Sequence, residues 1–123
     1  MLSEHFSRKE MACKCCHGLP EGGISQALLD GLEKLRKAVG DKPIHVTNAY
    51  RCVRHNKEVG GVANSQHVQG CAADIWVEGY SSFRLGGICD EIFDGVGIYI
   101  DQDFVHVDMR ENGTRPGRYT WYE

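Results

Sequence analysis

Two histidines and one aspartate occupy positions where their side chains need partners. Asp74 interrupts the apolar run Ala72–Val77, and an isolated carboxylate is costly to bury unpaired. His106 interrupts a second apolar run, Phe104–Met109, and His67 lies in the loop before Asp74. Two imidazoles and one carboxylate, with a position left for water, are typical of a catalytic zinc site. Spacing alone leaves an alternative, a buried Asp–His pair that joins the two strands by a hydrogen bond.

Cysteines form the second group with chemical potential. The chain has six, and the stretch Cys13-x-Cys15-Cys16-His17 could hold a structural metal ion. It lacks the second Cys-x-x-Cys pair that such sites usually have, so we favour free or locally paired thiols at Cys13, Cys15 and Cys16 over a second zinc ion. We expect Cys71, between Gly70 and Ala72, to be a small buried residue.

Several elements are predicted around these residues. Ser7 and Glu10 match a capping box that opens a short helical turn near Met11. Leucines at helical spacing after Ser25 predict a helix to about Val39, where Gly40 ends it. Further elements are expected at 53–59 (helix), after Ser81 or Ser82 (helix), from Ile44 toward Arg51 (strand), and at 72–77, 96–100 and 104–109 (strands).

The last two of these strands are separated by Asp101-Gln102-Asp103, which favours an antiparallel hairpin. The predicted fold class is therefore α+β, a small and mainly antiparallel sheet with flanking helices. We find no internal repeat or long linker, so we expect a single domain over residues 1–123.

Composition excludes several classes of protein. The 123 residues are 41% hydrophobic and 25% charged, as in globular proteins, and no apolar run reaches the ~18 residues of a membrane span. The net charge is −3 and the basic residues are dispersed, which argues against a nucleic-acid partner. The charged N-terminal residues are not a signal peptide. We therefore expect synthesis in the cytoplasm and, for any cell-wall role, release by a phage-type lysis system.

The motifs carry a resemblance to a known family. Ser65-x-His67-x-x-Gly70-x-Ala72-x-Asp74, followed by Asp103-x-x-His106-x-Asp108, resembles the zinc D-Ala-D-Ala carboxypeptidases, which include VanY-type enzymes and phage endolysins. The segment Thr47–Arg51, the run Gly95–Tyr99 and the late Trp121 are also similar to that family. The match covers nearly the whole chain, and so many coinciding positions make a chance match implausible.

The resemblance implies a zinc metallopeptidase that hydrolyses peptidoglycan stem peptides by metal-activated water, in the fold shared with the hedgehog signalling domain. His67, Asp74 and His106 would bind one catalytic zinc ion. Arg51 would stabilise the oxyanion, and Ser65, Gln66 and Tyr50 would line the substrate groove. A monomer acting on a D-Ala-D-Ala-like or internal stem peptide is expected.

The general base is the least certain role, because two carboxylates flank His106. Asp108 shares the strand face of His106, whereas Asp103 has the opposite parity. The family nevertheless places its acid/base three residues before this histidine, so we expect Asp103 to be the base and Asp108 to orient the imidazole. A non-catalytic, zinc-containing, hedgehog-like binding module, recognising a cell-wall peptide or a protein, is the alternative function.

Overall fold

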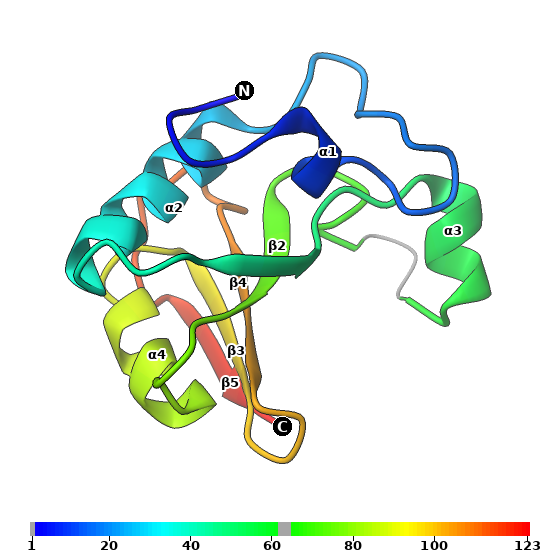
Figure 1. Cartoon of the computed structure of the whole chain (residues 1–123). Coiled ribbons are helices and arrows are strands. Elements are labelled where there is room, and N and C mark those ends of the chain that lie inside the picture. The colour runs from blue at the N-terminus through cyan, green and yellow to red at the C-terminus, as the bar shows by residue number, and fades with distance from the viewer. Residues whose placement is uncertain (1, 62–64) are drawn as a thin grey trace.

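A five-stranded sheet organises the chain, which we describe from a computed structural model covering residues 2–61 and 65–123 (Figure 1). In chain order the elements are α1 (Arg8–Met11), α2 (Gln26–Ala38), β1 (His45–Asn48), α3 (Val53–Glu58), β2 (Ala72–Trp76), α4 (Ser82–Cys89), β3 (Gly95–Tyr99), β4 (Phe104–Asp108) and β5 (Tyr119–Tyr122). The sheet order is β1-β2-β4-β3-β5. All neighbours are antiparallel except β3 and β5, which confirms the α+β prediction.

Serine caps begin three of the helices. The side chain of Ser7 accepts a hydrogen bond from the backbone of Glu10, and the reciprocal bond completes the predicted capping box of α1. Ser25 and Ser81 cap α2 and α4 in the same way. Each cap satisfies a backbone N–H that the first helical turn leaves without a partner.

Strict alternation along the strands divides the sheet into two faces. The residues directed to the helical side are apolar and almost fully buried: Ala73, Ile75, Val96, Ile98, Val105 and Val107. Leucines of α2 and Leu85 of α4 cover this face and form the main core with Phe93. In Figure 1, α2 and α4 lie together on one side of the sheet, whereas α3 lies on the other side.

The opposite face carries the polar candidates. The register pairs Asp74 of β2 with His106 of β4, and His106 in turn with Gly97 of β3. Because side chains on one face recur every second residue, Asp74, His106 and Asp108 all project to this side. The central position of β4 in the sheet order therefore places the two strands with unusual polar residues next to each other.

The last strand differs from the sequence prediction. Residues 119–122 form β5, which pairs in parallel with β3, whereas the sequence predicts no element there. The backbone N–H of Tyr119 donates to the carbonyl of Asp94, and that of Gly117 donates to the carbonyl of Phe93. The turn before β3 therefore anchors the chain segment that leads into β5. No helix among the described residues is long and apolar enough to cross a membrane.

Candidate metal centre

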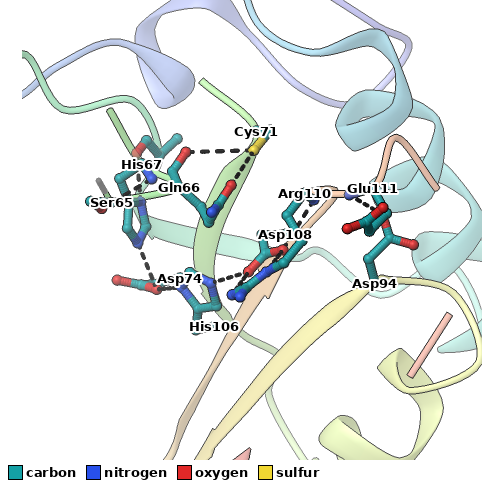
Figure 2. Close-up of polar contacts among 11 residues, drawn as sticks. Ser65, Gln66, His67, Cys71, Asp74, Asp94, His106, Asp108, Arg110 and Glu111 are labelled. Atoms are coloured by element: carbon teal, nitrogen blue, oxygen red, sulfur yellow. Dashed lines mark hydrogen bonds and ion pairs between the residues drawn. The ribbon is translucent and has the colours of Figure 1, made fainter. Parts of the chain in front are cut away.

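His67, Asp74 and His106 converge on one point of the polar sheet face (Figure 2). One carboxylate oxygen of Asp74 lies 3.2 Å from Nε2 of His67 and 3.2 Å from Nδ1 of His106. The two imidazole rings stand edge to face with centroids 5.1 Å apart. One potential ligand atom from each residue lies within 4.8 Å of the other two, which is the spacing that a single ion requires.

The outer hydrogen bonds of the two rings determine which nitrogen atoms face the centre. Nδ1 of His67 lies 2.7 Å from the carbonyl oxygen of Ala49, and a carbonyl can only accept, so this nitrogen donates. Nε2 of His106 lies 2.8 Å from Asp108 Oδ2 and donates to it. In the neutral rings, the inner nitrogens therefore direct lone pairs at the Asp74 oxygen. Three lone pairs on one point repel each other unless a cation joins them, so the donor set fits a zinc ion.

Electrostatics at the centre agree with this geometry. Without an ion, the inner nitrogens can instead carry protons: burial opposes ionisation of Asp74, but hydrogen bonds from His106 and His67 then outweigh it and hold the pKa of Asp74 well below its usual range. Burial also lowers the pKa of His106, yet the carboxylates of Asp108 and Asp74 reverse the effect and raise it. The site therefore keeps a carboxylate and attracts positive charge.

Behind His106, a buried ion pair fixes the ring. Asp108 is fully buried and accepts from Nε and Nη2 of Arg110 at 2.9 and 2.8 Å. Burial raises the pKa of Asp108, but Arg110 and His106 together lower it to about 2. A charged carboxylate is thus always available to orient the imidazole of His106, the role that the sequence predicts for Asp108.

Glycines of β3 make room for these side chains. A Cβ atom on Gly97 would lie 2.5 Å from Cζ2 of Trp121, and one on Gly95 would overlap the carboxylate of Asp108. Trp121 of β5 therefore packs over Gly97, and its ring centroid lies 5.2 Å from that of His106. Because Gly95 and Gly97 have no side chain, Trp121 can pack over β3 and Asp108 can form its buried ion pair with Arg110.

A cavity of about 340 Å³ opens at the metal centre. Besides the three candidate ligands it is lined by Arg51, Gly61, Ser65, Gln66, Tyr99, Phe104, Arg110 and Trp121. Arg51 has a buried Nε atom with no hydrogen-bond partner among the described residues. Because Arg51 lines the cavity, its guanidinium group could donate to an oxygen atom of a ligand there.

The structure brings most of the predicted site residues to this cavity. Ser65 and Gln66 line it, and Ser65 Oγ accepts from the backbone of His67. Gln66 also accepts from the thiol of Cys71 at 3.2 Å, and burial raises the pKa of Cys71 to about 11; Cys71 does not belong to the described group of candidate ligands. Tyr50 lies outside the described lining, near Cys13, Cys16 and Cys52, so its role in the substrate groove stays a prediction.

Asp103, the predicted general base, does not belong to the described cavity lining. It is exposed and lies in the hairpin turn with φ +56°. Its carboxylate accepts from the backbone N–H of Ser82 at 2.8 Å, at the N-terminus of α4 on the helical side of the sheet. Asp74 is the one carboxylate on the cavity wall among the described residues. The role of Asp103 as the base therefore stays a prediction.

Sequence reasoning did not assign five residues of the cavity wall to the site, namely Gly61, Tyr99, Phe104, Arg110 and Trp121. Tyr99 and Phe104 stack with ring centroids 4.3 Å apart at the end of the hairpin, and the guanidinium of Arg110 lies over the rings of Tyr119 and Trp121. Phe104 could have been identified from the sequence, because it lies two residues before His106 and therefore on the same face of the strand. Trp121 needed the pairing of β5 with β3, for which the sequence offers no local signal.

Comparison with known proteins matches this chain to one family. Residues 4–108 match the family model described as Peptidase M15. The chain is 32% identical over 104 residues to the peptidoglycan L,D-endopeptidase MepK of Escherichia coli K12, covering 78% of this chain and 54% of that protein. It is 50% identical over 44 residues to the zinc D-Ala-D-Ala carboxypeptidase of Streptomyces albus G, covering 36% of this chain and 17% of that protein.

The chain thus spans about half, or less, of the length of these relatives. The family match nevertheless includes both candidate histidine ligands, Asp74 and Asp108, so it covers the metal centre described above. On this evidence the chain belongs to the peptidase M15 family.

Proposed function

We propose that this chain is a zinc-dependent peptidase that hydrolyses peptide bonds of peptidoglycan stem peptides. The observation that carries the proposal is the convergence of three potential metal ligands at the wall of an open cavity that Arg51 also lines. The names of the two relatives, a zinc carboxypeptidase and a peptidoglycan endopeptidase, support the metal and the substrate class.

His67, Asp74 and His106 would hold the metal. When bound, zinc supplies a Lewis acid that lowers the pKa of a coordinated water toward ~7 and polarises the scissile carbonyl. Hydrogen bonds to the carbonyl of Ala49 and to the carboxylate of Asp108 hold the two rings so that their inner nitrogens stay free for the ion. The fixed tautomers keep the ligand set ready before any ion arrives.

Arg51 and the aromatic residues Tyr99, Phe104 and Trp121 would bind the peptide. The guanidinium group of Arg51 can donate to the carbonyl oxygen as negative charge develops on it. Tyr99 keeps its phenolic proton at neutral pH, because burial raises its pKa, and so offers a neutral donor. Trp121 and Phe104 provide the apolar surface that small D-alanine-like side chains can contact.

The experiment combines metal analysis with digestion of purified peptidoglycan and mass mapping of the fragments. We expect metal-replete protein to release either free D-alanine, as a carboxypeptidase does, or internally cut stem peptides, as an endopeptidase does. His106→Ala should lose the ion of this site and the cleavage together. Unchanged peptidoglycan with the metal-replete chain, or full cleavage by His106→Ala, would overturn the proposal.

One observation favours the non-catalytic alternative. Asp74 is the only carboxylate among the described residues of the cavity wall, so that wall presents no carboxylate besides a candidate metal ligand. A binding module would keep the metal and bind muropeptides without cutting them. Calorimetry with a stem peptide, followed by mass analysis of the same sample, separates the two functions, since saturable binding of an intact peptide identifies the module.

A further inference from the structure

Four of the six cysteines gather at a second place, remote from the cavity wall. The sulfur atoms of Cys13, Cys16 and Cys52 all lie within 4.8 Å of one another. The sulfur of Cys15 lies 3.9 Å from that of Cys52. In Figure 1 this is where the loop after α1 meets the beginning of α3.

The distances among Cys13, Cys16 and Cys52 fit three ligands of one ion, and Cys15 lies beside Cys52 as a candidate for the fourth position. Zinc–sulfur bonds of about 2.3 Å at tetrahedral angles place neighbouring sulfurs about 3.8 Å apart. Cys15 and Cys52 have nearly this separation. Cys13 and Cys16 have the Cys-x-x-Cys spacing, and Cys52 supplies from α3 the partner that the N-terminal stretch lacks.

Backbone N–H groups point at the sulfur atoms. The N–H of Cys52 donates to Cys13 Sγ at 3.4 Å, and that of His55 donates to Cys52 Sγ at 3.3 Å. The N–H groups of Cys15 and Cys16 also donate to Cys13, and that of Gly18 donates to Cys16. Amide donors stabilise thiolates and leave the remaining lone pairs for a cation.

The turn that presents these donors is closed by its own hydrogen bonds. His17 donates to the carbonyl of Cys13 at 2.9 Å and Cys13 donates to Gly18 at 2.9 Å. His17 itself has φ +59°, a conformation that costs a non-glycine residue energy. These bonds hold the turn in a conformation that keeps Cys13 and Cys16 close to each other.

The acid–base properties of the cluster support the geometry. Burial raises the pKa of Cys13, but the backbone donors, above all that of Cys52, outweigh it and lower the pKa to about 6. The neighbouring Cys52 raises the pKa of Cys15 to about 11. The first thiolate of the cluster therefore forms readily, and its negative charge opposes deprotonation of a second thiol. A divalent cation bound between the sulfur atoms removes the repulsion between the two negative charges.

We propose that Cys13, Cys16 and Cys52, with Cys15 as the fourth ligand, bind a structural zinc ion separate from the site formed by His67, Asp74 and His106. All four coordination positions are filled by protein, so the ion has no open position for catalysis. It joins the N-terminal loop to α3. Cys52 directly follows Arg51, whose backbone N–H donates to the carbonyl of His67, so the ion helps to position the guanidinium over the cavity.

Metal counting tests this inference independently of any peptidase activity. Elemental analysis of protein purified under reducing conditions should find about two zinc ions per chain for a closed site plus a catalytic site. His106→Ala and Cys16→Ser should each lose one of them, and the double variant both. Cys71→Ser, a thiol outside the cluster, is the matched control and should keep both. A single ion that His106→Ala removes completely would overturn the inference.

A second measurement leaves all six cysteines in place, in case Cys16→Ser fails to fold. Cobalt substituted into the His106→Ala protein should give the near-ultraviolet absorption of thiolate-to-metal charge transfer. Native alkylation should spare the four clustered thiols until a chelator is added. Immediate alkylation of all four, or a disulfide between any two of them in a non-reducing peptide map, would contradict a zinc site.

Discussion

The metal centre depends at the residue scale on which nitrogen of each histidine faces inward. Ala49 fixes this choice for His67, and Asp108 fixes it for His106. The sequence indicates Asp74 and His106 through their misplacement in apolar strands, and it identifies Asp108 through parity. It cannot indicate Ala49, because a backbone carbonyl carries no signature in the residue type.

Asp108 and Asp103 are expected to behave in opposite ways when each is changed to asparagine. Asp108→Asn should weaken zinc affinity at the catalytic site about 10–100-fold, because the ring of His106 loses a charged acceptor. Asp103→Asn should retain the metal but lose most of its turnover, because the predicted general base is removed. Competition with a chromophoric chelator measures the zinc affinity, and turnover assays measure the catalytic loss. A fully active Asp103→Asn protein would exclude Asp103 as the base.

Arg51 should matter for turnover rather than for folding. Arg51→Ala is expected to keep zinc and lose roughly 2.7–4 kcal/mol of transition-state stabilisation, as other oxyanion donors do. Arg51→Lys should recover only part of it, because lysine lacks the planar fork. Steady-state kinetics with a stem peptide measure the change. Arg54→Ala is the control, since this neighbouring arginine is exposed and pairs only with Glu58 on its own helix; equal kinetics for the two alanine variants would exclude the role of Arg51.

At the element scale, β3 combines an apolar face with a face of glycines. Val96 and Ile98 pack under the helices, while Gly95 and Gly97 leave space for Asp108 and Trp121. The sequence predicts this strand and its hairpin with β4, because the apolar runs and the short turn between them are close together in the chain. It does not predict β5, whose parallel pairing with β3 joins distant segments, and it does not bring Cys52 to Cys13 for the same reason.

Gly97→Ala is expected to disturb the site through Trp121. The new methyl group would lie 2.5 Å from the indole, so Trp121 must move away from His106, with a cost of about 1–3 kcal/mol. Denaturant unfolding measures the loss of stability, and tryptophan fluorescence measures the displacement of Trp121. Gly87→Ala on the exposed side of α4, where a Cβ meets nothing within 4 Å, should instead raise stability by about 0.5–1 kcal/mol. A Gly97→Ala protein with unchanged fluorescence and stability would show that Trp121 does not need this space.

At the scale of the whole molecule, Glu33 ties the N-terminal segment to α2. Its carboxylate accepts from Ser3 Oγ at 2.6 Å and from the backbone of His5 at 2.8 Å. Burial raises the pKa of Glu33, but the hydrogen bonds from Ser3 and His5 outweigh it and lower the pKa below 4.5. The N-terminal residues before α1 are thus held by one acidic side chain.

This arrangement predicts a pH dependence of stability. Because the pKa of Glu33 is lower in the folded chain, its contribution is complete above the unfolded value of about 4.5 and is lost as the pH falls through the folded value. Urea unfolding should therefore show Glu33→Gln less stable than the parent chain at pH 7 and closer to it below pH 4.5. Glu91→Gln, an exposed carboxylate, is the control. A constant difference across this range would exclude the proposed linkage.

The register that pairs Asp74 with His106 has a consequence for folding kinetics. These residues are 32 positions apart in the chain, so the metal centre is complete only after β2 has docked on the β3–β4 hairpin, a late step that needs closure of a long loop. An ion bound to this site stabilises contacts that the transition state for folding lacks. Stopped-flow measurements should therefore find that zinc at the catalytic site slows unfolding and leaves the refolding rate nearly unchanged.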